Sequence, residues 1–317
     1  PMYCPYLRGK QFELLALREF SGEFENNHTI VPIIEPVKKQ VNGLNAAALS
    51  MIKNGMKFAV ILNPSDGDYR HTGIDNDILK SLTALTNDRD NWIPAYIYKN
   101  NGKALLDHAN QNKLSNLMII FPSGADVNDE ELMELLSKDE VAYLVSGNLN
   151  NNRSARGRLL KLGKALISLE DRFNERLRNA DYANEVDEFF SEDFAYYKND
   201  GLAGFADYTP MAKDFIEGGM LPYAIAIHLT YQKSADQIFV HHFVSDNNFD
   251  QSNIRGKFHE AAIKIEPFFN ENGLDHTAAV DEFILKAESE DGYPGLGYIK
   301  KLSVKNHLEL ITLILSK

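Results

Sequence analysis

The sequence predicts an α/β fold of the (β/α)8 type, similar to a TIM barrel, and three observations lead to this prediction. Short, almost continuously apolar runs alternate with stretches of helical periodicity. The first seven apolar runs begin about 23 to 35 residues apart, a spacing that suits β-α units with parallel strands. The chain also lacks the glycine-rich first turn of a nucleotide-binding doubly wound sheet, which is the alternative fold.

The elements follow from these patterns in chain order. Because both faces of a barrel strand are covered by protein, apolar runs predict strands over 3–10, 29–37, 57–63, 92–99, 116–121, 141–146 and 164–170. Intervening periodic segments predict helices over 11–20, 44–53, 76–86, 103–111 and 129–137. The run 222–231, paired as a hairpin with 237–245, is expected to be the eighth barrel strand. Helices are expected over 254–269, 277–287 and 303–315.

We expect a single barrel domain over 1–317, with an insertion across the barrel mouth at 171–221 and a C-terminal helical segment at 253–317. Within the insertion, the stretch 181–200 carries seven acidic residues, six aromatic residues and only Lys198 as a base. This stretch is too aromatic for a disordered linker, which favours a packed functional insertion.

Composition limits the classes of function. The 317 residues include 45 acidic and 33 basic side chains, and a formal net charge of −12 makes nonspecific nucleic-acid binding unfavourable. The exception is a basic stretch at 151–169, which is either a solvated loop and helix or a phosphate-binding patch. Cys4 is the only cysteine, so an intramolecular disulfide and Cys-rich zinc sites are excluded. Without an 18-residue apolar run or a signal-peptide pattern, we expect no membrane contact and a cytoplasmic location.

Polar residues at the ends of the expected strands are the candidates for a functional site, because barrels carry their sites at the carboxyl ends of the strands. Glu35 interrupts an apolar strand, where a carboxylate is costly unless it is paired or functional. It is either a buried ion pair with Arg8 or Lys10 or a catalytic group. Lys10 itself is either solvated, an acid or a phosphate contact.

The later strands add further candidates. Asp171 and Arg172 form either an ion pair or a ligand clamp, and His228 is either a hydrogen-bonded core residue or a catalytic acid. Asp207 and Tyr208 follow a glycine-rich extended run that allows close backbone approach. The adjacent histidines at 241 and 242 should lie on opposite faces of their strand.

Sequence motifs for common cofactors and mechanisms are missing. The chain contains no P-loop, HExxH motif, GxSxG elbow or CxxC pair, which argues against the usual ATPases, zinc proteases and serine hydrolases. The cofactor is therefore unknown. Glu35, Asp171, Asp207 and His228 could hold Mg²⁺ or Mn²⁺, although a metal-free acid–base site would have the same composition.

Several segments together resemble the Beta protein family of phage and bacterial proteins. They are PYLRGKQFELLAL, VPIIEPVK, LEDRFNERLRNADY, GFADYT, PYAIAIHLTY, HHFVSD and YPGLGYIKKLSVKNHLEL, which cover nearly the whole chain. The family is uncharacterised and often found in mobile or defence-associated gene neighbourhoods, so the resemblance implies a shared site but no reaction. The positions that it indicates are Lys10, Glu13, Glu35, Asp171, Arg172, Asp207, Tyr208, His228, Ser303 and His307. Asn306 and His307 stand where we expect a histidine pair in relatives, which puts a paired-histidine role in doubt.

Two hypotheses follow for the function. The first is a hydrolase or transferase acting on a phosphate-containing ligand such as a nucleotide or a nucleic-acid end. In it Arg8, Lys10 and Arg172 bind phosphate, Glu35 or Asp171 acts as base or metal ligand, and His228 acts as acid. Asp207, Tyr208, Ser303 and His307 complete the expected ligand-binding set. The alternative is a non-catalytic sensor or partner subunit of an anti-phage or mobile-element module, with 181–200 contacting a protein encoded nearby.

Overall fold

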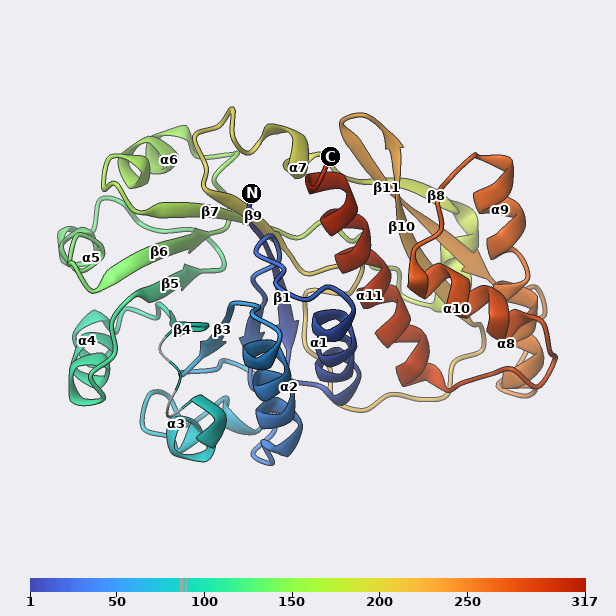
Figure 1. Ribbon diagram of the computed structural model, residues 1–317, viewed down its shortest axis with the longest axis horizontal. Coiled ribbons are helices and arrows are strands. Elements are labelled where there is room, and N and C mark those ends of the chain that lie inside the picture. Colours follow the sequence, from blue (N-terminus) through green and yellow to red (C-terminus); the bar gives the residue numbers. More distant parts are fainter. Residues whose placement is uncertain (86–87, 89) are drawn as a thin grey trace. The chain divides into compact units, whose positions relative to one another are not determined.

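The computed structural model describes residues 1–85, 88 and 90–317, and the chain divides into two compact units (Figure 1). The first, which we call the barrel unit, comprises 1–10, 17–171 and 196–208. The second, the sheet unit, comprises 11–16, 172–195 and 209–317. That 1–317 forms a single barrel domain stays a prediction.

Eight parallel strands close the barrel in the order β1–β2–β3–β4–β5–β6–β7–β9. The strands are β1 (Tyr3–Arg8), β2 (Ile33–Glu35), β3 (Phe58–Ile61), β4 (Trp92–Ile97), β5 (Leu117–Phe121), β6 (Val141–Ser146), β7 (Ala165–Glu170) and β9 (Gly204–Asp207). The predicted fold class, a (β/α)8 barrel of the TIM type with C-terminal helices, is confirmed. The first seven strands lie where the apolar runs predict them.

Helices alternate with these strands along the chain (Figure 1). They are α1 (Gln11–Glu23), α2 (Asn42–Lys53), α3 (Ile78–Ser81), α4 (Gly102–Gln111), α5 (Glu130–Leu136), α6 (Arg153–Leu160) and α7 (Asp193–Tyr196). The helix expected over 76–86 is interrupted: α3 is one turn long and a 3₁₀ turn, Thr83–Leu85, follows it. The last residue of that prediction, Thr86, lies outside the described residues. Asp129 caps α5 as its acid-rich first turn indicates, accepting hydrogen bonds from two backbone N–H groups.

Side chains at alternate positions of each strand fill the barrel interior, as the two-residue period of a strand requires. Cys4 and Tyr6 of β1 point inward, and so do Ile33 of β2 and Ile61 of β3. All four are buried. Burial also raises the pKa of the Cys4 thiol, so Cys4 serves as a small hydrophobe.

The eighth barrel strand is β9, and the prediction that 222–231 forms it is wrong. β9 pairs in parallel with β7 on one side and with β1 on the other. It lies inside the stretch 171–221 that was expected to be an insertion. The sequence does not predict β9 as a strand, because β9 spans only Gly204–Asp207 and ends in a carboxylate. The run 222–231 is longer and more apolar, and therefore gives the stronger strand signal.

The sheet unit is built on a three-stranded antiparallel sheet in the order β10–β11–β8. Its strands are β8 (Asp187–Ser191), β10 (Ala226–Ser234) and β11 (Gln237–Val244), so the predicted hairpin is confirmed. Four helices follow: α8 (Ile254–Ala262), α9 (Ile265–Glu271), α10 (Ala278–Ala287) and α11 (Leu296–Leu315). The helix expected over 254–269 is therefore two helices. Residues of β10, β11 and these helices share one buried apolar cluster.

The aromatic residues of 181–200 mostly serve as core. Tyr182, Phe190, Phe194 and Tyr197 are buried, while Phe189 and Tyr196 are about 40% exposed (40% and 41%). The partner-subunit hypothesis, in which 181–200 is the contact surface, stays a prediction. In the described part of the chain, no helix combines the length and apolar composition that crossing a membrane requires.

Candidate functional site

At the carboxyl ends of β1 to β4, the inward-facing positions of the barrel change from apolar to polar. Side chains two positions apart on a strand face the same way, so Arg8 follows inward-facing Tyr6. In the same way Glu35 follows Ile33, and Asn63 follows Ile61. Lys99 likewise comes two positions after inward-facing Ile97. We call Arg8, Glu35, Asn63 and Lys99 the mouth layer. Barrel enzymes carry their chemistry at this end of the strands.

Glu35 is the best-anchored member of the mouth layer. Its side chain is 1% exposed, and Oε1 accepts a 2.6 Å hydrogen bond from the Tyr6 hydroxyl. Oε2 accepts hydrogen bonds from the backbone N–H groups of Ser65 and Asp66, at 2.8 and 3.2 Å. Burial and the charge of Glu35 raise the pKa of Tyr6 well above its usual value, so this hydroxyl keeps its proton and donates. Glu35 thus ties the loop after β3 to β1.

Arg8 lies between two carboxylates and two aromatic rings. Its Nε is 3.7 Å from Glu35 Oε1 and its Nη2 is 3.6 Å from Asp66 Oδ2. Both distances exceed the 2.7–2.9 Å typical of direct charge-assisted hydrogen bonds. The guanidinium carbon is 5.0 Å from the ring centre of Tyr6 and 5.6 Å from that of Tyr208. Arg8 is therefore an ion-pair partner of Glu35, as predicted, and the ring of Tyr208 lies beside the same guanidinium group.

Asn63 and Lys99 extend the mouth layer across β3 and β4. The Asn63 side chain exchanges two 2.8 Å hydrogen bonds with the backbone of Ile97, which fixes the first residues after β3 against β4. Lys99 Nζ donates to the carbonyl oxygens of Asn63 and Pro64, at 3.2 and 3.4 Å. Partial burial lowers the pKa of Lys99, although the charges of Glu35 and Asp66 oppose this shift. The layer therefore holds two cations close to one buried carboxylate.

Other predicted residues of the barrel unit occupy different places. Asp207 is buried at an outward-facing position of β9, where it accepts a short hydrogen bond from the Tyr3 hydroxyl. Asp171 is exposed and follows β7, two residues after inward-facing Leu169. Lys10 is the N-cap residue of α1, just beyond the end of β1. Thus Arg8, Glu35 and Tyr208 are in one cluster, and Asp207 is not part of it.

The remaining predicted residues belong to the sheet unit. Arg172 forms a bidentate ion pair with Asp193, with N–O distances of 2.6 and 3.0 Å, a partner that the sequence analysis does not name. His228 lies on β10 and not on a barrel strand, because β9 closes the barrel. His307 Nδ1 is 2.8 Å from the Thr230 hydroxyl. Ser303 is buried on α11, and Glu13 is buried on α1.

Three of the four residues considered as ligands for Mg²⁺ or Mn²⁺ belong to the barrel unit, and these three, Glu35, Asp171 and Asp207, do not converge on one point. Among the described residues, no three His, Cys, Asp or Glu side chains converge as such a site would require. Glu35 is already engaged by Tyr6 and two backbone N–H groups, and Asp207 by Tyr3. Acid–base and electrostatic chemistry by side chains is what the mouth layer can supply.

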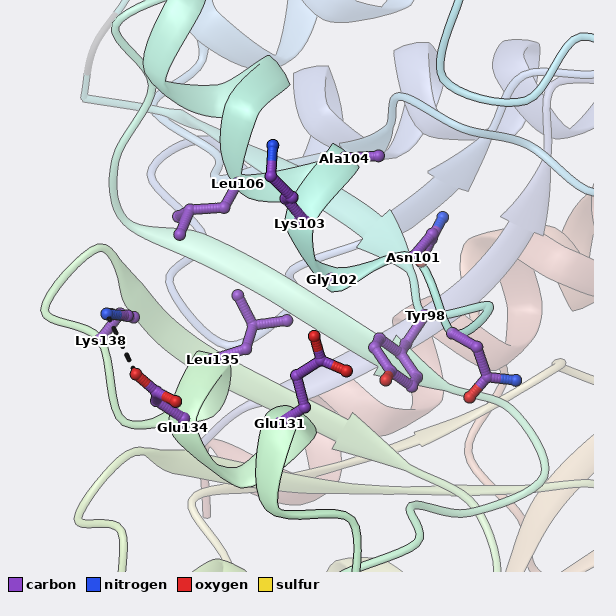
Figure 2. Close-up of a pocket in the computed structure, with 11 residues that line it drawn as sticks. Tyr98, Asn101, Gly102, Lys103, Ala104, Leu106, Glu131, Glu134, Leu135 and Lys138 are labelled. Atoms are coloured by element: carbon purple, nitrogen blue, oxygen red, sulfur yellow. Dashed lines mark ion pairs between the residues drawn. The ribbon is translucent and has the colours of Figure 1, made fainter.

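Two hollows lie near the carboxyl ends of the middle strands. One, of about 250 Å³, is bordered by the loops after β5 and β6 and by Asn152 and Ala155 of the first turn of α6. The other, of about 350 Å³, lies between α4 and α5 on the outside of the barrel (Figure 2). Figure 2 shows Tyr98 and Glu131 at one end of it and the Lys138–Glu134 ion pair, 3.9 Å long, at the other. Its charges are mixed and exposed, so it carries no functional assignment.

Sequence reasoning placed Asn63 and Lys99 at strand ends but did not select them. The signal that could have found them is the parity of each strand, because both stand two residues after an inward-facing apolar side chain. Asp66 gave no such signal, since only the loop fold after β3 brings it to Arg8.

The chain was compared with protein-family models, curated proteins and solved structures, and none matches. Membership of the Beta protein family stays a prediction, and the functional argument depends on the geometry of the site.

Proposed function

We propose that the chain is an enzyme of the hydrolase or transferase class and that the mouth layer binds a phosphate-bearing ligand such as a nucleotide. The TIM-barrel fold is compatible with an enzyme. The observation that carries the proposal is the placement of two cations, Arg8 and Lys99, around the buried Glu35 at the carboxyl ends of β1 to β4. A guanidinium and an ammonium group placed together at a barrel mouth are the side chains that bind phosphate oxygens.

In this proposal Glu35 is a positioning residue. Its oxygens are occupied by Tyr6, Ser65 and Asp66, so it orients Arg8 and the loop after β3 rather than accepting a proton from a substrate. Arg8 would take two phosphate oxygens through its planar guanidinium group, and Lys99 would add a point charge. Asp171 follows β7, two residues after inward-facing Leu169, and is the proton acceptor that we propose for the barrel unit. Its removal should lower turnover and leave ligand affinity nearly unchanged.

Binding and turnover can be tested with a panel of probes. Isothermal titration with inorganic pyrophosphate and nucleoside mono-, di- and triphosphates measures affinity, and release of inorganic phosphate from the same compounds measures hydrolysis. We expect at least one probe to bind, and Arg8→Gln and Lys99→Met each to weaken it by about tenfold, the loss of roughly 1.4 kcal/mol. Lys103→Met is the matched control, because Lys103 is a highly exposed lysine at the start of α4 that pairs with Asp107. Binding of no probe, or equal loss in the control, would contradict the proposal.

The resemblance to the Beta protein family, and no structural observation, leads us to expect that Arg8 and Lys99 contribute to defence against phage. Loss of protection in cells carrying Arg8→Gln, at unchanged protein level, would support it. Full protection by that variant would show that the mouth layer has no such role.

A further inference from the structure

The sheet unit contains a line of hydrogen-bonded groups that runs from a buried carboxylate to a partly exposed imidazole. Arg176 Nη2 donates to Glu188 Oε1 at 2.6 Å, and Asn174 donates to the same oxygen at 3.2 Å. The other oxygen, Oε2, is 2.5 Å from His242 Nε2. His242 Nδ1 is in turn 2.8 Å from His228 Nδ1. We call Glu188, His242 and His228 the relay.

The hydrogen-bond chemistry of the relay fixes the proton positions. A carboxylate beside Arg176 only accepts, so His242 donates its Nε2–H to Glu188. A neutral imidazole has a single N–H, so His242 Nδ1 must accept, and His228 must donate through Nδ1–H. The lone pair of His228 is therefore on Nε2. Burial lowers the pKa of both histidines, which keeps both rings neutral near pH 7.

The surroundings hold the His228 ring in one orientation. His228 and His242 are direct partners on β10 and β11. The ring centre of Tyr182 lies 4.5 Å from that of His228, and the ring centre of Phe173 lies 5.0 Å from it. His242 is 2% exposed, whereas His228 is partly exposed. Within the described residues, His228 Nε2 has no hydrogen-bond partner, so the outer end of the relay is an oriented acceptor.

We propose that His228 is a general base of a second site on the sheet unit, and that it accepts the proton of a hydroxyl group or a water molecule through Nε2. The O–H bond breaks, the N–H bond forms, and the positive charge that develops on His228 is stabilised by His242 and, through it, by Glu188. These two are positioning residues. The titratable groups that face His228 are the neutral His242 and the charged Lys300, and the positive charge of Lys300 favours a substrate that carries an anionic group. This inference goes beyond the proposed function, because it does not use the mouth layer.

The proton positions can be measured directly on the intact chain. Long-range ¹H–¹⁵N spectra of the histidine side chains at pH 7.5 distinguish the two neutral tautomers and the imidazolium form. We expect His228 to carry its proton on Nδ1 and His242 on Nε2. A His228 proton on Nε2, or a charged His228, would overturn the proposal.

The accessibility of the lone pair on His228 Nε2 can be measured separately, by chemical modification. Diethyl pyrocarbonate acylates an unprotonated, accessible imidazole nitrogen, and mass spectrometry locates the product. We expect His228 to react at least tenfold faster than buried His242. Lowering the pH from 7.5 to 6.0 should slow His228 less than twofold, whereas free N-acetylhistidine, with an ordinary pKa of about 6.5, slows about fourfold. Reaction of His228 at the rate of His242 would show a purely structural network.

Two variants test the relay itself. His242→Gln and Glu188→Gln should each shift His228 toward the Nε2–H tautomer and lower its acylation rate at least threefold. His241→Gln is the matched control, because His241 points to the opposite face of β11 and pairs with Asp187 at 3.0 Å. If His242→Gln does not fold, as its amide spectrum will show, Glu188→Gln alone decides. An unchanged tautomer and rate in a folded variant would contradict the relay.

Discussion

Arg8 and Glu35 are direct partners on the neighbouring parallel strands β1 and β2, and their side chains approach to 3.7 Å at the mouth of the barrel. The carboxylate is buried, and it also accepts hydrogen bonds from Tyr6, Ser65 and Asp66. One side chain thus joins β1, β2 and the loop after β3. The first prediction concerns the stability that this junction provides.

Replacing Glu35 with alanine should destabilise the barrel unit by about 3 to 5 kcal/mol, because it leaves buried donors and Arg8 without their acceptor. Glu35→Gln should cost less, since an amide oxygen still accepts. Urea unfolding followed by tryptophan fluorescence measures the effect in the barrel, because Trp92, the only tryptophan, is buried on β4. Glu134→Gln is the control: its carboxylate is exposed, and the change should cost less than about 0.5 kcal/mol. An equally small effect at Glu35 would show that the junction is not structural.

Gly67 supports the same loop by its backbone conformation. Its φ of +68° is in the left-handed region, and an added Cβ would lie 2.2 Å from the carbonyl oxygen of Val37. Gly67→Ala should therefore destabilise the barrel unit by more than about 1 kcal/mol. Gly157 lies inside α6, and its Cβ would meet nothing within 4 Å, so Gly157→Ala should stabilise by about 0.5 to 1 kcal/mol. In the same urea assay, a lower free energy of unfolding for Gly67→Ala and a higher one for Gly157→Ala would confirm the two local geometries. Changes in the same direction for both variants would contradict them.

The lowered pKa of His228 predicts how stability depends on pH. Burial, the neighbouring His242 and the positive charge of Lys300 lower the pKa of this ring in the folded state, whereas in the unfolded chain a histidine titrates near pH 6.5. The unfolded state therefore binds more protons below pH 6.5, and stability falls as the pH is lowered from there toward the folded pKa. The loss from His228 between pH 6.5 and 5.0 should be on the order of 1 kcal/mol, with an upper limit of about 1.7 kcal/mol for a ring that stays neutral in the folded state.

The His228→Gln variant isolates this contribution. Circular-dichroism denaturation at pH 7.0, 6.0 and 5.0 should show a smaller loss of stability on acidification in the variant than in the original chain. An identical pH dependence of the two proteins would mean that His228 titrates normally in the folded state.

Most of the barrel could be predicted from sequence because its strands are almost continuously apolar and its β-α spacing is regular. The eighth strand could not, since Gly204–Asp207 is short and contains a glycine at one end and a carboxylate at the other. The pairing of β9 with β1 connects residues about 200 positions apart, and no local pattern encodes such a contact.

The sequence predicts those residues of the candidate site whose direction follows from the alternation of inward- and outward-facing side chains along a strand. Glu35 stood out as a carboxylate between apolar residues, and Arg8 as its partner, and both lie at the barrel mouth. Asp207 is the last residue of the mostly apolar strand β9, but its position in the alternation of side chains turns it outward to Tyr3. The partner of Arg172, Asp193, and the partner of His228, His242, depend on tertiary contacts that the strand pattern does not contain.

The most direct test of the mouth layer is a titration of the chain with inorganic pyrophosphate, followed by ¹⁵N spectra of the arginine Nε–H groups and the lysine ammonium groups. We predict saturable shifts of Arg8 and Lys99, with Lys103 unchanged, and a Lys99 shift that saturates at about tenfold higher pyrophosphate concentration in Arg8→Gln. Saturable binding that moves the signals of other cations and leaves those of Arg8 and Lys99 unchanged would contradict an anion site at the mouth of this barrel.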